Sequence, residues 1–424
     1  MLDIKLIRNE PDMVRAALSR RGPHAVAALD TLLELDVQRR EVLVQVEEKR
    51  GLRNAVSEDI AVAKRNKEDA SARIAAMRAV GDEIKTLEAR LKEIEAALGE
   101  ELLQVPNLPE DSAPAGGEED SVVMHSWGEP RKFAFPPKDH LDLAGAFDMI
   151  DMERGARTSG SRFAYLKGDL VFLQFALIQF ALQKLAGKGF RPVIVPVLVR
   201  DEAMYGTGFF PTDMQQVYRV EADDLNLVGT SEVPLAALHM DEILDESDLP
   251  VRYVGYSSCF RREAGAAGKD TRGIFRVHQF DKVEMFSFCA PDKSPDEHDF
   301  MRSVEEEVLQ DLGLPYHTVN IAAGDLGAPA AKKYDLEAWL PTQERYREVT
   351  SCSNCTDYQA RRLKVRAKGD KGGPYLLHTL NGTVVALGRT MIAIMENYQT
   401  EDGTIAVPAV LKPYLPAGTE VLGG

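Results

Sequence analysis

A long run of sequence without proline does most to limit how this chain can fold. Residues 25–99 contain no proline, and Gly51 and Gly81 are their only internal glycines before Gly99. In the second half of this run, apolar residues recur at alternating steps of three and four, namely Met77, Val80, Ile84, Leu87, Leu91, Ile94 and Leu98. Such a heptad seam, with charged residues between its members, predicts a helix that packs along another helix as a coiled coil.

The first half of the run supplies the partner helix. Residues 29–63 carry apolar side chains at irregular helical spacing, and the polar cluster 64–69 that follows is typical of a turn. We therefore predict an antiparallel coiled-coil hairpin over residues 27–99. With about 38 residues in each helix and a rise of about 1.5 Å per residue, the arm is on the order of 57 Å long and is expected to project into solvent.

The charge of the chain restricts the partners that it can bind. It has 51 basic and 67 acidic residues, a net charge of −16, which argues against a surface that is basic throughout. The hairpin has 13 basic and 15 acidic residues and is nearly neutral. Two interpretations stay open, a solvated coiled coil with ion-paired faces or a surface that reads a nucleic-acid backbone. The candidate contacts for the second are Arg39, Arg40, Lys49, Arg50, Arg53, Lys64, Arg65, Arg73 and Arg78.

Length and composition predict a cytoplasmic protein of two or three domains. The 424 residues exceed what a single core usually holds, and 44% of them are hydrophobic. We expect no transmembrane helix, because no run of about 18 apolar residues is free of polar interruptions. Charges at Asp3 and Lys5 argue against a signal peptide. The four cysteines are too few for a disulfide framework and fit a reducing compartment.

The composition changes near Pro106, which predicts a domain boundary. We expect an N-terminal domain over residues 1–104, a linker rich in proline and glycine over 105–120, and a second domain over 121–424. In the second domain the sequence predicts helices at 170–187, 296–311 and 384–397, and strands at 190–199, 252–257, 273–277 and 282–288. This order favours an α+β fold with a mostly antiparallel sheet flanked by helices. Neither a Rossmann fingerprint nor a P-loop is present.

The segment from Cys259 to Phe280 carries the richest chemistry. A strand with Arg261, Arg262 and Glu263 leads into a glycine-rich loop and a predicted returning strand. Arginine suits bidentate capture of carboxylate or phosphate. Far downstream, Gly388 and Arg389 open a predicted helix, where a polyphosphate tail could bind.

These motifs resemble those of class II aminoacyl-tRNA synthetases. The Arg261–Glu263 segment with its loop resembles motif 2, Gly388-Arg389 resembles motif 3, and the helix before Val195-Pro196 resembles motif 1. More narrowly, the chain is similar to the seryl-tRNA synthetase family in Thr230-Ser231-Glu232, in the segments 278–285, 334–339 and 378–382, and in the arm. Thr383-Val384-Val385 departs from the motif 3 region of many bacterial members.

The resemblance implies a serine–tRNA ligase that activates L-serine with ATP and loads it on serine tRNA, and on selenocysteine tRNA where that exists. It implies serine binding by Thr230, Ser231, Glu232, Arg261, Glu284, Asn381 and Thr383. It implies ATP binding by Arg261, Arg262, Glu263, Val277, Phe280, Glu348, Val349, Thr350, Ser351 and Arg389. Arg261 and Arg389 are the implied catalytic residues, and Glu348 and Ser351 the implied Mg²⁺ ligands. The family also implies a homodimer through the motif 1 helix.

Two alternative functions and one alternative metal site have to be weighed against this interpretation. A paralogue that loads an amino acid onto a carrier protein would share the catalytic domain but lack the arm. A non-catalytic coiled-coil protein would have lost the arginines of motifs 2 and 3, which are intact here. The pair Cys352 and Cys355 suggests zinc, but no second pair accompanies it, so we expect reduced thiols and no structural zinc.

Overall fold

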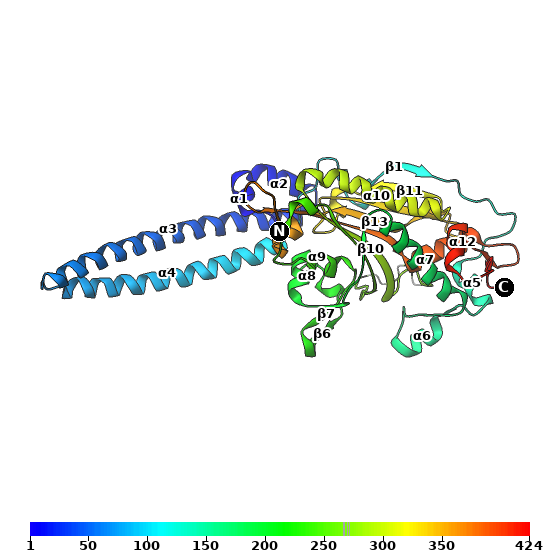
Figure 1. Ribbon diagram of the computed structural model, residues 1–424, viewed down its shortest axis with the longest axis horizontal. Coiled ribbons are helices and arrows are strands. Elements are labelled where there is room, and N and C mark those ends of the chain that lie inside the picture. Colours follow the sequence, from blue (N-terminus) through cyan, green and yellow to red (C-terminus); the bar gives the residue numbers. More distant parts are fainter. Residues whose placement is uncertain (266–267, 269, 271) are drawn as a thin grey trace. The chain divides into compact units, whose positions relative to one another are not determined.

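The hairpin predicted from the heptad seam is present as α3 (Pro23–Arg65) and α4 (Ser71–Gln104) in the computed structural model (Figure 1). The two helices have 43 and 34 residues. The first begins earlier than predicted because Pro23 occupies its first turn, where a proline is tolerated. Seam residues Ile84 and Ile94 are buried, the latter against Val42 and Val46 of α3, which confirms the coiled coil.

Two short helices build a base for the hairpin. They are α1 (Ile4–Asn9) and α2 (Pro11–Ser19), and both pack against α3. Arg8 donates two hydrogen bonds of 2.7 Å to the buried carboxylate of Asp36, and this contact lowers the pKa of Asp36. Residues 2–106 form one compact unit, and Met1 with residues 107–424 forms the other. The structure describes residues 1–265, 268, 270 and 272–424.

An eight-stranded sheet is the centre of the second unit, with strand order β1-β11-β12-β13-β16-β10-β9-β4. All of its pairings are antiparallel except that of β4 with β9. The strands are β1 (Val122–Trp127), β4 (Arg191–Ile194), β9 (Val251–Phe260), β10 (Gln279–Cys289), β11 (Tyr316–Asn320), β12 (Lys332–Leu340), β13 (Arg345–Asn354) and β16 (His378–Ala386). This topology confirms the predicted α+β fold.

Three helices cover one face of this sheet, namely α7 (Asp169–Ala186), α10 (Ser294–Asp311) and α12 (Leu387–Tyr398). Their buried residues join those of the strands in a single core that includes Leu177, Val308 and Met391. By length and composition α7 could cross a membrane, with a mean hydropathy of 1.3. However, 44% of its residues are buried inside the unit, and Phe172 and Phe175 are exposed on its outer side.

Shorter elements complete the unit. The helices are α5 (His140–Ala146), α6 (Met152–Ser159), α8 (Asp201–Thr207), α9 (Glu232–Ala237) and α11 (Tyr358–Leu363). The strands are β2 (Ile150–Asp151), β3 (Tyr165–Leu166), β5 (Leu198–Val199), β6 (Arg219–Val220), β7 (Leu225–Leu227), β8 (Ile243–Asp245), β14 (Arg366–Lys368), β15 (Tyr375–Leu376), β17 (Ile405–Ala406) and β18 (Val421–Leu422). Short 3-10 turns lie between them, including η2 (Met214–Gln216).

Two local predictions were wrong, and the strand predicted at 190–199 is divided into β4 of the central sheet and β5 of a three-stranded sheet. Residues 273–277 are not a strand, because the strand that returns from the motif 2 loop begins only at Gln279, and the segment before it forms turns. The predicted helix 384–397 begins only at Leu387, because Val384 to Ala386 complete strand β16. Val385 and Ala386 are strand rather than helix because they pair with Val283 and Lys282 of β10, a pairing that the sequence does not display.

The stretch 105–120, for which we expected a linker, is held to the second unit from residue 107 onwards. The amide of Asn107 donates to the carbonyl of Ala328 over 2.8 Å, and its side chain donates to the carbonyl of Cys355 over 2.9 Å. Glu110 N donates to Ala331 O over 2.9 Å. Backbone hydrogen bonds of this kind fix a segment that composition alone marks as flexible.

Candidate active site

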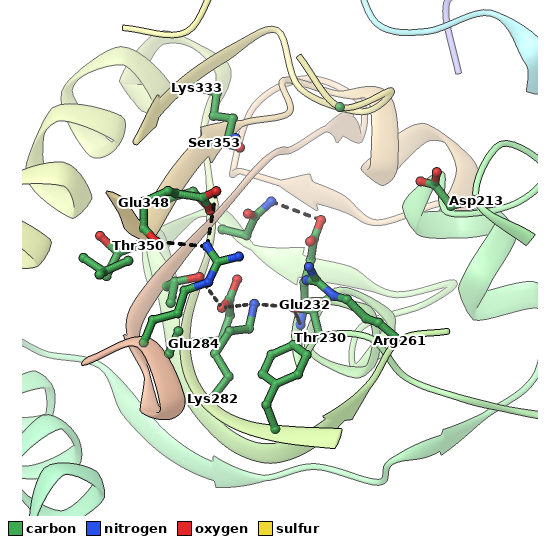
Figure 2. A pocket seen from close by; sticks show the side chains of 18 of the residues that line it. Asp213, Thr230, Glu232, Arg261, Lys282, Glu284, Lys333, Glu348, Thr350 and Ser353 are labelled. Carbon is green, nitrogen blue, oxygen red and sulfur yellow. Dashed lines mark hydrogen bonds and ion pairs between the residues drawn. The ribbon is translucent and has the colours of Figure 1, made fainter. Parts of the chain in front are cut away.

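A pocket of about 400 Å³ lies over the central strands, on the face opposite α7, α10 and α12 (Figure 2). Side chains alternate between the two faces of a strand, so Phe280, Lys282 and Glu284 of β10 all reach it. Most of the predicted site residues line this pocket: Thr230, Glu232, Arg261, Glu263, Val277, Phe280, Glu284, Glu348, Val349, Thr350, Ser351, Asn381, Thr383 and Arg389. Segments distant in sequence thus converge on one cavity.

Acidic and amide side chains gather at one end of the pocket. Glu232 starts α9 and is buried, and its Oε1 accepts hydrogen bonds from Gln359 Nε2 over 2.8 Å and from Asn381 Nδ2 over 3.0 Å. Burial, and after it the negative charge of Glu284, raise the pKa of Glu232 to about 7. A cation bound beside Glu232 would favour its charged form. This end of the pocket therefore suits a small, positively charged, hydrogen-bonding ligand.

A β-bulge explains the unusual Thr383-Val384-Val385 sequence. Val283 pairs with Val385 and Glu284 pairs with Thr383, so Val384 is an extra residue in β16. The extra residue keeps the Thr383 hydroxyl in the pocket, where it donates to Glu284 Oε2 over 3.2 Å. Both valines are buried in the core. Although Thr383-Val384-Val385 departs from the family pattern, the bulge therefore keeps a hydroxyl beside Glu284 in the pocket.

Lys282 belongs to the same polar end, and sequence reasoning missed it. Its buried ammonium lies 2.6 Å from Glu284 Oε2 and donates to Thr230 Oγ1 over 2.8 Å (Figure 2). It lies two positions before Glu284 on β10, so both side chains point to the same face. That i, i+2 relation was the sequence signal that could have identified it.

Cationic and aromatic side chains line the remainder of the pocket. The guanidinium of Arg261 lies over the ring of Phe280 at 5.3 Å, and Arg261 Nε donates to the carbonyl of Gly229 over 3.1 Å. The carboxylate of Glu263 pairs with Arg276 at 2.8 Å. A flat aromatic surface beside arginines suits a nucleotide, whose base stacks and whose phosphates are anionic.

Phe275 is a second aromatic residue that sequence analysis did not single out. Two guanidinium groups lie over its ring, that of Arg347 at 4.0 Å and that of Arg389 at 4.8 Å from the centroid. It precedes β10 in the turns that we predicted as a strand. An apolar ring before a strand usually fills a core, so the sequence does not indicate that the ring of Phe275 lines the pocket. Its contacts with the two arginines depend on the packing of three segments that are distant in the sequence.

A second bulge brings Glu348 and Ser351 to the same face of β13. Residues three apart on a regular strand face opposite sides. Here Leu336 pairs with Thr350 and Glu337 with Glu348, so Val349 is the extra residue and both side chains reach the pocket. Glu348 lies 3.3 Å from Arg389 Nη1. Burial would raise the pKa of Glu348, but the charges of Arg389, Lys333 and Arg261 outweigh burial and lower it to about 2.

Two predicted site residues do not line the pocket. The hydroxyl of Ser231 lies 2.8 Å from that of Ser257 and is completely buried. Arg262 lies over the ring of Tyr218 at 5.8 Å. Thr350 lines the pocket, but its hydroxyl donates to the buried Glu305 over 2.9 Å. Ala266, Ala267, Lys269 and Thr271 of the motif 2 loop are outside the described residues.

The two cysteines of the C-x-x-C pair take part in the structure as buried thiols. Cys352 Sγ lies 4.0 Å from the carbonyl of His298, and Cys355 Sγ lies 3.6 Å from Asn381 Nδ2. Within the described ranges, no group of three or more His, Cys, Asp and Glu side chains could hold a metal ion. The expected absence of zinc stays a prediction.

In the other unit, the candidate cations of the arm fall into two groups. Arg39, Lys49 and Arg50 form ion pairs across the hairpin with Glu95, Glu83 and Glu88, and Arg40 pairs with Asp36. The second group, whose members are exposed and form no ion pair with any residue of the described ranges, consists of Arg53, Lys64, Arg65, Arg73 and Arg78. A neighbouring carboxylate offsets the charge of each paired cation, so the unpaired cations are the stronger candidates for binding an anionic partner.

Comparisons with known proteins agree with this geometry. Residues 216–398 match the profile of the tRNA synthetase class II core domain (G, H, P, S and T), and residues 1–109 match the seryl-tRNA synthetase N-terminal domain. The chain is 48% identical to the serine–tRNA ligase of Symbiobacterium thermophilum over 98% of both chains.

Solved structures give the same result. The seryl-tRNA synthetase from Pyrococcus horikoshii, complexed with ATP, matches with a TM-score of 0.95 and 42% identity over 100% of this chain and 99% of its own. The cytoplasmic serine–tRNA ligase from Naegleria fowleri, in complex with AMP, matches with a TM-score of 0.90 and 34% identity over 100% and 98%. The chain therefore belongs to the seryl-tRNA synthetase family of class II aminoacyl-tRNA synthetases.

Proposed function

We propose that this pocket activates L-serine with ATP and then passes the serine to the 3′ end of serine tRNA. The chain is an ATP-dependent aminoacyl-tRNA ligase of this family. The observation that supports these site assignments most is the position of Arg261, between the polar end with Glu232 and the aromatic end with Phe280. A group at that position can contact both reacting molecules.

In the first step, a carboxylate oxygen of serine attacks the α-phosphorus of ATP, and the bond to the β-phosphate breaks to release pyrophosphate. We assign Arg261 to the serine carboxylate and the α-phosphate, Glu263 and Phe280 to the adenine, and Arg389 to the γ-phosphate. Catalysis then consists mainly of alignment and of charge stabilisation at phosphorus. In the second step, the 3′-hydroxyl of the terminal adenosine attacks the seryl carbonyl and AMP leaves.

Selection of serine follows from the polar end of the pocket. We assign Glu232 and Thr230 to the serine ammonium, and Glu284 with Thr383 to the hydroxyl. A pocket built to hydrogen-bond a hydroxyl rejects analogues that lack it, because its own buried polar groups are then unpaired. Lys282 and Thr383 both contact Glu284 Oε2 and so fix the position of its carboxylate.

The pocket also fits Mg²⁺ as a companion of ATP. Glu348 and Ser351 offer a carboxylate and a hydroxyl from one face of β13, and these are the hard oxygen ligands that Mg²⁺ takes, with phosphates and waters completing the shell. The ion would neutralise phosphate charge. The low pKa of Glu348 keeps its carboxylate ionised at neutral pH for this purpose.

Serine-dependent pyrophosphate–ATP exchange tests the proposed first step directly. Purified protein with ATP, Mg²⁺ and labelled pyrophosphate should form labelled ATP with serine and far less with threonine, alanine or glycine. Charging of serine tRNA tests the second step, and a selenocysteine tRNA, where available, is expected to be charged with serine as well. Exchange that depends equally on all four amino acids would refute the assignment of the pocket.

Replacement of Glu284 by alanine is expected to erode the preference for serine over alanine and glycine. Loss of one buried hydrogen-bonding partner should reduce the ratio of kcat/KM values by about a hundredfold, since hydroxyl-reading sites discriminate by about 10⁴ or more. Glu284→Ala also leaves the Lys282 ammonium without its carboxylate, so thermal unfolding is measured in parallel and Glu284→Gln serves as the milder variant. An unchanged ratio in a folded variant would place hydroxyl recognition elsewhere.

We further propose a cytoplasmic homodimer. Phe172, Phe175 and Ile194 expose 50%, 55% and 88% of their surface on α7 and the edge strand β4, two elements that pack together. Apolar side chains exposed on neighbouring elements mark an interaction site, and a two-fold contact is the commonest way to cover one. The four cysteines are free thiols, as expected in a reducing compartment.

Sedimentation at micromolar concentration should therefore give the mass of a dimer. Ile194→Lys places a charge on this patch and is expected to shift the protein towards monomer, by a factor of about ten or more in dissociation constant. Ile243→Lys is the matched control, because Ile243 is also exposed (47%) but lies on the small sheet of β8. A monomeric wild-type protein would contradict the proposal.

A further inference from the structure

Gln216, at the end of the 3-10 turn η2, makes an unusual contact with the start of the motif 2 loop. Its side-chain Nε2 donates to the carbonyl of Ala264 over 2.9 Å, and its Oε1 accepts from the amide of Ala264 over 2.9 Å. Its own backbone carbonyl accepts from the amide of Arg262 over 2.8 Å. One residue thus satisfies three backbone groups on both sides of Glu263.

The residue enclosed by these bonds has a strained backbone. Glu263 has a φ of +51°, in the left-handed region that side chains with a Cβ rarely adopt. Such a conformation persists only where the surroundings fix it. In this conformation the carboxylate of Glu263 lines the pocket and pairs with Arg276 at 2.8 Å. The Gln216 amide is placed to supply that restraint.

The residue that precedes this 3-10 turn, Asp213, also contributes to the pocket. Asp213, which accepts a hydrogen bond from Gln216 N over 2.9 Å through its carbonyl, places its side chain in the pocket (Figure 2). Burial raises the pKa of Asp213, and the charge of Arg261 opposes that rise. The segment 213–216 therefore links the wall of the pocket to the backbone of the motif 2 loop.

We propose that Gln216 is a positioning residue for ATP binding, which holds Glu263 in the backbone conformation that presents its carboxylate to the adenine. This inference rests on the proposed function of the pocket and adds a residue that does not itself line it. Because the contact is a reciprocal amide pair, it requires one donor and one acceptor on the same side chain. Glutamine meets that requirement and glutamate does so only when protonated.

The test is pyrophosphate–ATP exchange by the full-length chain with three single substitutions. Gln216→Ala removes both bonds and is expected to raise KM for ATP about tenfold, with KM for serine within about twofold. Gln216→Glu keeps the acceptor but sets a carboxylate oxygen against the Ala264 carbonyl, so its KM for ATP should exceed that of Gln216→Ala at pH 8. Gln215→Glu, at the exposed neighbouring position, is the control and should behave as the wild type.

The dependence on pH separates positioning from a general loss of structure. Protonation turns the introduced glutamate into a donor, so the KM ratio of Gln216→Glu to Gln216→Ala should fall as the pH is lowered from 8.5 to 5.5. The charged groups around this turn are Asp213, Arg262, Glu263 and Arg276. The wild type and the variants share them, so each value is divided by the wild-type value at the same pH.

Three results would overturn the inference: an unchanged KM for ATP in Gln216→Ala, a parallel rise in KM for serine, or a KM ratio that is constant with pH. If Gln216→Ala folds poorly, the comparison of Gln216→Glu with the wild type across pH decides alone. Transfer from preformed seryl-adenylate to tRNA needs no ATP and should keep its rate. A wild-type protein without serine-dependent exchange would refute the proposed function instead, which keeps the two failures distinct.

Discussion

Arg261→Ala is expected to abolish seryl-adenylate formation and leave the fold intact. The guanidinium is the group that we place between the serine carboxylate and the α-phosphate, and loss of a preorganised donor at a developing charge costs about 10²–10³ in kcat. Because this arginine touches both substrates, the loss of kcat/KM in pyrophosphate–ATP exchange should be at the upper end of that range or beyond it. Initial rates at saturating serine and ATP measure the effect on kcat.

The stability of this variant should hardly change. Arg261 is exposed, and its contacts are with the carbonyl of Gly229 and the ring of Phe280 at the pocket. The free energy of unfolding should therefore change by no more than about 0.5 kcal/mol. Arg219→Ala is the matched control, since Arg219 is partly exposed and pairs with Asp224 outside the pocket. Near-wild-type exchange by folded Arg261→Ala would remove this arginine from the reaction.

Removal of the distal arm should separate the two steps of the reaction. Deletion of residues 43–91, closed by a short turn, is expected to preserve serine-dependent exchange, because that step needs no tRNA. Aminoacylation of serine tRNA should fall by about a hundredfold or more, since phosphate contacts dominate affinity for a nucleic acid. Serine tRNAs differ in anticodon but share a long extra arm of the RNA, so we expect the hairpin to recognise that feature of the tRNA. Discrimination against tRNAs that lack the long extra arm should therefore also be lost. The cut preserves Leu29, Leu32 and Asp36, which are buried in the base of the hairpin.

A charge variant tests the same surface without a deletion. Replacement of Arg53, Arg73 and Arg78 by alanine should weaken tRNA binding and reduce its salt dependence. Replacement of the ion-paired Arg39, Lys49 and Arg50 should have a smaller effect, because neighbouring carboxylates already neutralise them. If the shortened protein charges serine tRNA as well and as selectively as the intact one, the arm is only a solvated coiled coil.

Much of this molecule followed from local sequence patterns. The coiled-coil arm could be predicted because the apolar residues of a heptad seam are buried when another helix packs along them. The residues of the seam are also close to one another in the sequence. The motifs around Arg261, Glu284 and Arg389 indicated the family before any coordinates. The helix 170–187 and strands 252–257 and 282–288 were also predicted, since each is a continuous apolar or alternating run.

The tertiary structure alone decided which side chains meet. Glu348 and Ser351 share a face because Val349 is an extra residue in β13, and Thr383 reaches Glu284 because Val384 is an extra residue in β16. A bulge is a property of two paired strands, so neither sequence reveals it. The contacts of Phe275 with two arginines, of Lys282 with Thr230 and of Gln216 with Ala264 likewise join segments far apart in the chain. The sequence determined most of the helices and strands and the side chains that they carry. The pairing of the strands determined which of those side chains lie together in the pocket.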